Sequence, residues 1–476
     1  MSKDINSTGS APARAGRKAG KKPESEEPLR LRRVAVKGLF GLYDHEIELH
    51  LEDRVTILHG PNGVGKTALL KLMAALLTGR YNDFADYPLA SLTVMLTDGS
   101  TIVVEPPKKM IGKRRGTRLR LRYTDAGGQT KEPAEVMLDS PEIDAWIDEI
   151  GGGLPFVSRI GTNRWHDEHV GDELTARQLF HRYGDPIPHR SRRPQDSNPD
   201  HAWLTRLQRR AHVHVIETQR LLQMASRDSG GYPRRGPVFL PAVRGCAQDI
   251  SRRMKETLAT YGTRSQSLDQ SFPQRLLKPA GASGPTRADL KKRMAELNQQ
   301  RTDLQDIGLL DSTSGTPFDV ASLDELAPEQ TAVLSLYVED TQKKLAVLED
   351  LARRITILLE NINSKFKHKS IRIDREKGFI ALGHDGSPLD PDSLSSGEQH
   401  ELVLLYDLLF RVQPGTLVLI DEPELSLHVG WQKRFLPDLL EIVKVAELDA
   451  IIATHSPFIV GDRSDLMVPL AAEIDA

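Results

Sequence analysis

The stretch that decides the fold reads Gly60-Pro61-Asn62-Gly63-Val64-Gly65-Lys66-Thr67. It fits G-x-x-x-x-G-K-[ST], the pattern of a loop that binds phosphate. The short apolar run at 55–58 precedes this stretch, and the leucine-rich segment 66–77 follows it, as a buried strand and a packed helix would. A strand before and a helix after the loop is the setting in which this motif holds a nucleotide.

The residue types of the loop suit a triphosphate. Glycines let the backbone pass close to the ligand so that its N–H groups face phosphate, and the next helix adds roughly half a positive charge at its N-terminus. We predict that Lys66 reaches the β- and γ-phosphates of ATP and that the Thr67 hydroxyl ligates Mg²⁺.

A second motif combines an apolar run with two acids. Residues 417–420 read Leu-Val-Leu-Ile and are followed by Asp421 and Glu422, which suits a central strand buried on both faces with acids at its carboxyl end. We predict that Asp421 holds Mg²⁺ through its water shell and that Glu422 orients or deprotonates the attacking water. The alternative is that both acids only end a strand before the turn at Pro423.

Two further motifs give the chain a family resemblance. The segment LSSGEQ, residues 394–399, resembles the LSGGQ signature of ABC ATPases, and Thr454-His455-Ser456 resembles their switch histidine. P-loop, signature, acidic strand and histidine follow each other in the order of that family. Ser396 stands where the family usually has glycine, a variation also found among its soluble members.

The resemblance implies a sandwich dimer that binds ATP and Mg²⁺. In such a dimer, nucleotide on one P-loop is contacted by the signature of a second copy, and hydrolysis loosens the pair. The implied signature contacts are Ser395, Ser396, Gly397 and Glu398. A serine at this position also serves simply as a helix N-cap, which is the alternative interpretation.

The resemblance also implies roles for single residues between and after these motifs. His455 would contact the γ-phosphate or the water held by Glu422; a local hydrogen bond at a strand end is the alternative. Gln219 is the candidate for the glutamine that senses Mg²⁺, although an exposed polar residue explains it nearly as well. Ser426 and His428 occupy the place of the loop between protomers.

The predicted fold class is α/β: a P-loop ABC-type ATPase head, with a mixed sheet and an antiparallel β subdomain, plus an inserted helical subdomain. Alternation over 91–123, with a hairpin turn at Asp98-Gly99, predicts the antiparallel layer. Helical spacing predicts helices at 203–210, 287–304 and 321–365, with a short antiparallel arm, and 370–383 resembles a β-hairpin. We expect a disordered tail at 1–28, head lobes at 29–140 and 366–476, and a mostly helical insertion at 141–365.

The segments 216–222, 265–277 and 421–432 resemble soluble bacterial AAA/ABC ATPases of the RecF, SMC and OLD-like group. Such proteins commonly act on DNA or form the ATPase half of an anti-phage defence system. Only 21 residues follow His455, so we predict no Toprim nuclease in this chain, and any nuclease or toxin effector would be a separate partner.

Composition limits the other possible functions. The formal net charge of -2 gives no chain-wide basic bias, and the single cysteine, Cys246, excludes a disulfide within the chain. No apolar run predicts a membrane span or a signal peptide, so we expect a cytoplasmic protein. The pairs His212 with His214 and His166 with His169 lack a third ligand nearby, and we do not predict metal binding there.

One basic segment is a candidate contact for non-specific duplex DNA, with a solvated hairpin as an equal alternative. Its residues are Lys108, Lys109, Lys113, Arg114, Arg115, Arg118, Arg120 and Arg122. Our first hypothesis is an ATP-hydrolysing dimeric switch that acts with DNA or a partner effector in anti-phage defence. The alternatives are a RecF/SMC-like ATPase of DNA repair or chromosome maintenance, and a nucleotide-gated scaffold that does not bind DNA.

Overall fold

The computed structural model describes most of the chain. The described ranges are 29–110, 116–138, 157–161, 164–167, 172–175, 202–216, 222–224, 239–277, 286–311 and 328–470. The expected disordered tail at 1–28, the candidate Gln219 and the basic residues Lys113 to Arg115 lie outside these ranges, so those predictions stay untested.

A five-stranded sheet in the order β11-β17-β18-β3-β19 forms the centre of the head, and every neighbouring pair is parallel. Its strands are β3 (Val55–His59), β11 (Val213–Ile216), β17 (Leu417–Asp421), β18 (Asp449–Thr454) and β19 (Met467–Pro469). Successive residues of β17 face opposite cores: Leu417 and Leu419 pack on one side, Val418 and Ile420 on the other. Burial of both faces explains the unbroken apolar run.

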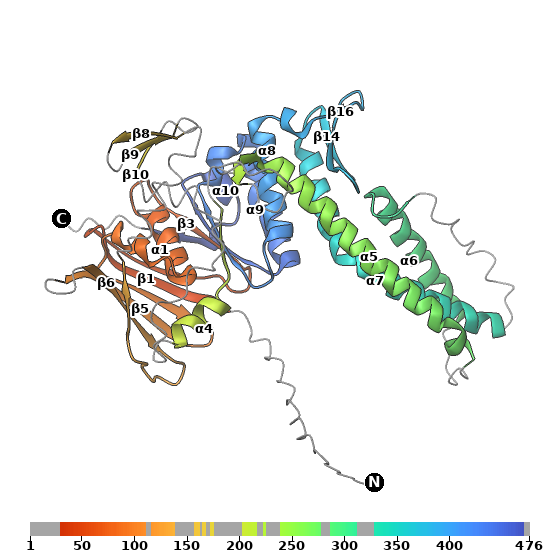
Figure 1. Ribbon diagram of the computed structural model, residues 1–476, viewed down its shortest axis with the longest axis horizontal. Helices are drawn as coiled ribbons and strands as arrows, with labels where there is room; N and C mark the ends of the chain where they lie inside the picture. The colour runs from red at the N-terminus through yellow and green to blue at the C-terminus, as the bar shows by residue number, and fades with distance from the viewer. Residues whose placement is uncertain are drawn as a thin grey trace, which may run out of the picture.

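Helix α1 (Lys66–Thr78) packs on one face of this sheet and is itself covered by a second sheet (Figure 1). That six-stranded antiparallel sheet has the order β2-β1-β4-β5-β6-β7. Its strands are β1 (Leu31–Leu39), β2 (Tyr43–Glu48), β4 (Ser91–Leu96), β5 (Thr101–Met110), β6 (Gly116–Thr124) and β7 (Ala134–Met137). The predicted antiparallel layer is confirmed, including the turn between β4 and β5, where Gly99 has φ +87°.

Helices cover the opposite face of the parallel sheet. These are α8 (Ser396–Tyr406) and α9 (Val429–Ala446), together with the head-proximal ends of two long helices, α5 (Ala242–Leu276) and α7 (Pro328–Lys365). With α6 (Arg287–Asp306), the long helices leave the head as an arm (Figure 1). At 1.5 Å per residue, the 35 residues of α5 extend about 52 Å.

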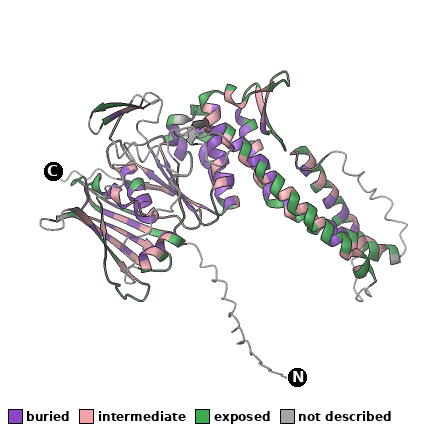
Figure 2. Cartoon of the chain, viewed as in Figure 1, coloured by how far each residue is buried: buried purple, intermediate pink, exposed green. Residues whose placement is uncertain are grey.

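The faces of the arm helices that meet one another are buried and their outward faces are exposed (Figure 2), and the buried residues include apolar ones from all three helices. The predicted helix at 287–304 is confirmed as α6 and the helix at 203–210 as α4 (Ala202–Arg210). The predicted helical region at 321–365 is confirmed from 328 onward as α7, and residues 321–327 lie outside the described ranges. Helix α5 was not predicted. Glycine and arginine before it hide its start, and its many polar residues dilute the apolar stripe, because only one side of the helix packs.

Smaller elements complete the described chain. The predicted hairpin at 370–383 is confirmed as β14 (Lys369–Asp374) and β15 (Gly378–Gly383), which pair in antiparallel fashion. The others are η1 (Tyr81–Ala85), β8 (Val157–Gly161), β9 (Arg164–Asp167), β10 (Asp172–Thr175), β12 (Leu222–Met224), β13 (Phe239–Pro241), β16 (Pro388–Leu389), η4 (Pro391–Ser393), η5 (Asp407–Arg411), η6 (Pro423–Ser426), α10 (Pro457–Val460) and η7 (Ser464–Leu466). In the described ranges, none of the helices has the length and apolar character needed to cross a bilayer.

A buried charged group, which we name the arm-root cluster, joins the arm to the head. Lys365, at the end of α7, forms ion pairs with Glu401 of α8 and, at 2.7 Å, with Asp438 of α9. A second polar contact joins α5 to α8, since the Tyr406 hydroxyl donates to Asp249 Oδ2 at 2.7 Å. Both long helices are therefore bonded to the helix that begins with the signature motif.

Candidate nucleotide site

The loop at 60–67 connects β3 to α1 in the conformation that its glycines allow. Gly65 has φ +94°, and a Cβ at this position would lie 2.5 Å from Leu39 Cδ2, so a side chain does not fit. The ammonium of Lys66 curls over the loop and donates to the carbonyl oxygens of Gly60 at 2.8 Å and Pro61 at 2.9 Å. Lys66 is thus held at the mouth of the loop.

The fold brings the predicted Mg²⁺ residues together across 354 positions of sequence. The Thr67 hydroxyl donates to Asp421 Oδ1 at 3.1 Å, because parallel strands β3 and β17 end at the same edge of the sheet. One hydroxyl and one carboxylate are hard oxygen donors, and Mg²⁺ in nucleotide sites is commonly held by so few protein ligands plus phosphates and water. The pair fits the ion.

The three carboxylates of Asp421, Glu422 and Glu424 lie near this pair, together with the ammonium groups of Lys66 and Lys71. Burial, with repulsion from Glu422 and Glu424, raises the pKa of the Asp421 carboxyl despite the hydrogen bond from Thr67. Burial lowers the pKa of Lys66, and the same carboxylates oppose that effect. An excess of carboxylates in a partly buried place is the electrostatic environment that a divalent cation balances.

Glu422 and His455 lie at this same edge, as predicted. Glu422 has φ +43°, a left-handed conformation that is uncommon for glutamate, and its N–H donates to the Ala453 carbonyl at 2.9 Å. Its carboxylate lies 3.9 Å from His455 Nδ1, and both side chains are partly open to solvent, at 29% and 42%. The backbone bend after Asp421 therefore turns Glu422 toward the histidine.

The acid that contacts His455 most closely is one that the sequence reading missed. Glu424, in the segment DEPELSLH, is 5% exposed, and its Oε1 lies 3.0 Å from His455 Nδ1. The same oxygen accepts hydrogen bonds from Thr454 Oγ1 at 2.7 Å, His455 N at 2.9 Å and Ser456 N at 3.2 Å. The only signal in the sequence is an acid two residues after Glu422, which reads as solvated without the fold.

The signature segment opens α8 on the helical side of the head. Ser395 is the N-cap, its hydroxyl accepting from Glu398 N at 3.3 Å while the Glu398 carboxylate accepts from Ser395 N at 2.7 Å and pairs with Lys369 at 2.9 Å. Ser395 is thus an N-cap, a role that leaves the signature contacts implied by the resemblance a prediction. Ser395 and Ser396 are both exposed, whereas Glu398 is buried, so the serines are the part of the motif that faces outward.

The remaining candidates have mixed surroundings. His428 is exposed and caps α9, its Nδ1 accepting from Gly430 N at 3.2 Å. On β6, Arg118 and Arg122 lie on the face opposite the buried leucines, as predicted for the basic hairpin, but they pair with Glu135 at 2.8 Å and Glu105 at 3.1 Å. Because each of these arginines is paired with a glutamate, part of its charge is already compensated, and we expect it to bind DNA phosphates more weakly.

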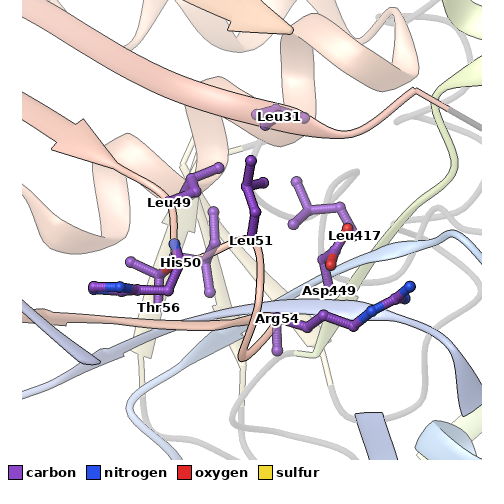
Figure 3. A pocket seen from close by; sticks show the side chains of 10 residues that line it. Leu31, Leu49, His50, Leu51, Arg54, Thr56, Leu417 and Asp449 are labelled. Atoms are coloured by element: carbon purple, nitrogen blue, oxygen red, sulfur yellow. Dashed lines mark hydrogen bonds between the residues drawn. The ribbon is translucent and has the colours of Figure 1, made fainter. Parts of the chain in front are cut away.

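A small hollow lies away from this edge (Figure 3). It sits where β3, β17 and β18 begin, and parallel strands place their beginnings at the opposite edge from the P-loop. Leucine side chains line much of it, and Asp449 there is paired with Arg30, whose Nε and Nη2 each donate at 2.8 Å. The hollow is therefore separate from the edge of the sheet that carries the P-loop. We name that edge the nucleotide edge, and its residues are Lys66, Thr67, Asp421, Glu422, Glu424 and His455.

Two families match different parts of the chain, and together the matched parts contain all four nucleotide motifs. Residues 33–150, with the P-loop, match a family described as "AAA domain". Residues 253–461, with the signature, acidic strand and histidine, match one described as "AAA domain, putative AbiEii toxin, Type IV TA system". Together with the fold, these matches show that the chain carries AAA-type ATPase domains built on an α/β P-loop fold.

Particular relatives resemble parts of the chain. It is 32% identical over 148 residues to the "Retron Ec83 probable ATPase" of Escherichia coli, covering 25% of this chain and 27% of the relative. It is 30% identical over 122 residues to "Protein ea59" of Escherichia phage lambda, covering 25% and 23%. The chain thus matches only about a quarter of the length of each of these relatives.

Solved structures of SMC heads align over most of the chain at low similarity. A Pyrococcus furiosus Smc head with an extended coiled coil, bound to the C-terminal domain of ScpA, covers 93% of both chains at 12% identity and a TM-score of 0.33. The SMC head domain of Thermotoga maritima covers 91% of this chain and 92% of its own at 10% identity and a TM-score of 0.30.

Proposed function

We propose that the protein hydrolyses ATP with Mg²⁺ at a site completed by a second copy of the chain. The observation that carries the proposal is the convergence of Thr67, Asp421, Glu422 and His455 at one edge of the sheet. A nucleophile-orienting carboxylate beside a hydroxyl and carboxylate suited to Mg²⁺ is the arrangement that phosphoryl transfer to water requires.

Each residue has a task in this proposal. Thr67 and Asp421 would hold Mg²⁺, which when bound would neutralise charge on the phosphates. Lys66 leaves the loop carbonyls and binds the β- and γ-phosphates, while Glu422 orients water for in-line attack on the γ-phosphorus. His455 contacts the γ-phosphate from its strand end. Water attacks the γ-phosphorus and gives a proton to the Glu422 carboxylate, the bond to the β-γ bridging oxygen breaks, and ADP and phosphate leave.

Exposed groups support a head-to-head homodimer. Ser395 and Ser396 present an accessible helix N-terminus, which favours an anion from a second copy. Near Glu422 and His455 along the chain, Leu425 is 62% exposed and Phe458 is 46% exposed, an unusual solvent exposure for such side chains. A second copy would bury them while its serines reach the nucleotide.

We further propose a switch in anti-phage defence that acts with a nuclease or toxin effector on a separate chain. The resemblance to a probable retron ATPase and the toxin named in the family description support it. Cytoplasmic location is part of this proposal. The paired arginines of β6 give less support to the alternative of a RecF/SMC-like clamp loaded on duplex DNA.

The central test is Glu422→Gln, which keeps nucleotide binding but removes the carboxylate that orients water. With ATP and Mg²⁺, light scattering should report a dimer of the variant and turnover reduced at least about 100-fold. Lys66→Ala should give neither dimer nor turnover. Glu447→Gln is the matched control, since Glu447 also has positive φ, at +53°, but caps the far end of α9.

A monomeric Glu422→Gln variant at saturating ATP and Mg²⁺ would contradict the sandwich dimer. Measuring ATP turnover with and without duplex DNA then distinguishes a clamp on DNA from an effector-linked switch or a scaffold. Stimulation by DNA would favour the clamp, whereas unchanged turnover would leave the effector-linked switch or the scaffold.

A further inference from the structure

We propose that Glu424 is a positioning residue that fixes the orientation and tautomer of His455; the inference deepens the proposed ATPase function and rests on it. Glu424 lies on η6, directly after the acidic strand, and His455 lies at the end of neighbouring β18. The fold thus sets a buried carboxylate from one motif against the histidine of another.

The contacts of Glu424 hold the histidine by both its backbone and its ring. Glu424 Oε1 accepts from His455 N at 2.9 Å and lies 3.0 Å from His455 Nδ1, while the hydroxyl of Thr454 approaches at 2.7 Å. A carboxylate oxygen only accepts, so Nδ1 must carry a proton to bond it. The opposite ring nitrogen, Nε2, is then unprotonated and is the one that can accept a hydrogen bond.

The other acid near the ring is poorly placed for this task. Glu422 Oε1 is 3.9 Å from Nδ1, beyond hydrogen-bond distance, and its side chain is 29% exposed. Glu424 is 5% exposed, and its Oε1 lies 3.0 Å from Nδ1. The two glutamates therefore have different roles: the partly exposed Glu422 orients water, and the buried Glu424 orients His455.

The burial of Glu424 argues against a role in stability alone. Four donors crowd its Oε1, whereas its buried Oε2 has no hydrogen-bond partner. An orphaned carboxylate oxygen costs on the order of 1–3 kcal/mol, and a neutral side chain would avoid that cost. A charged acceptor is retained where it orients a catalytic ring, as the aspartate of a hydrolytic triad orients its histidine.

The direct test reads the ring itself by ¹⁵N NMR of histidine-labelled protein at about pH 8. Loss of one signal in His455→Gln assigns the resonance. We expect Nδ1 of His455 to be protonated in the wild type and the protonation to shift toward Nε2 in Glu424→Ala, as in free histidine. An unprotonated Nδ1 in the wild type, or an unchanged tautomer in Glu424→Ala, would overturn the inference.

Kinetics give a second test that a purely structural role would not pass. Glu424→Ala should lower kcat about 10- to 100-fold with KM for ATP changed less than about 2-fold, and Glu424→Gln, which keeps an acceptor oxygen, should recover part of the loss. In a His455→Ala background the Glu424→Ala change should have no further effect on kcat. Additive losses, or a fully active His455→Ala, would contradict positioning.

Thr454→Val is the matched control. It removes one donor to Glu424 Oε1 but leaves the contact with the ring, so kcat should stay within about 3-fold of wild type. A loss equal to that of Glu424→Ala would assign Glu424 to loop structure instead. Wild type without ATP turnover would refute the proposed function, while the NMR measurement would still decide on the tautomer.

Discussion

The nucleotide edge and the arm-root cluster are both rich in buried acids, yet they differ in access. Lys365, Glu401 and Asp438 have side chains exposed by 2%, 2% and 8%, so the arm-root ions meet only one another. At the nucleotide edge, Glu422 and His455 are 29% and 42% exposed. An open group of acids accepts a cation and a ligand, whereas a sealed one only ties helices together.

The largest effect should follow from breaking the sealed cluster. Lys365→Met leaves two buried carboxylates without a counter-charge, and we expect a loss of about 3–5 kcal/mol in the free energy of unfolding, measured by urea titration. Lys343→Met is the matched control, because Lys343 also lies on α7 but pairs with Glu339 where the two side chains are 42% and 54% exposed, and it should cost less than about 1 kcal/mol.

A triple change, Lys365→Met with Glu401→Gln and Asp438→Asn, should recover most of that loss, since no unpaired charge remains inside. Equal destabilisation by the single and triple variants would show that packing, not charge, holds the arm root.

At the nucleotide edge, we expect removal of a buried charge to raise the free energy of unfolding, not to lower it. Because the pKa of Asp421 is raised above its usual 3.8, the folded state loses stability as pH rises through the interval between the two values. Asp421→Asn should therefore stabilise the protein at neutral pH by ~1 kcal/mol in thermal melts without Mg²⁺, while abolishing turnover. The gain should vanish below about pH 4. Destabilisation at neutral pH would contradict the charge excess inferred here.

The smallest effect concerns the capping box of α8. Burial raises the pKa of Glu398, but bonds from Lys369 and Ser395 outweigh it and hold the pKa below its usual 4.5. Its contribution to stability is then complete above that value and is lost as pH falls. Glu398→Gln should lower the melting temperature by a few degrees at about pH 7, and the difference from wild type should shrink toward about pH 4.

Sequence reasoning reached the motifs whose chemistry is local. The apolar runs before the P-loop and before Glu422 were each predicted as buried strands, and the structure places both in one sheet whose described strands run parallel. Continuous apolar runs flanked by glycine or acids carry enough information by themselves, because both faces of such strands are buried. The antiparallel layer followed from its alternation, because only one face of its strands is buried.

The residues that were missed depend on contacts distant in sequence. Glu424 and Lys365 read as ordinary surface charges, and only the fold places Thr454 beside the first and Glu401 beside the second. Helix α5 escaped because a helix packed on one side only has few apolar residues. No spacing rule applied to a single chain segment reports such pairings.

The position of strand β19 limits where the protein can be truncated or tagged. It lies beside β3 at the margin of the parallel sheet, and Leu470 N donates to the His59 carbonyl at 2.8 Å, next to the start of the P-loop. Truncation before Met467 would remove β19 and leave β3 as an unpaired edge strand, which favours aggregation. Purification tags are therefore better separated from this segment by a spacer.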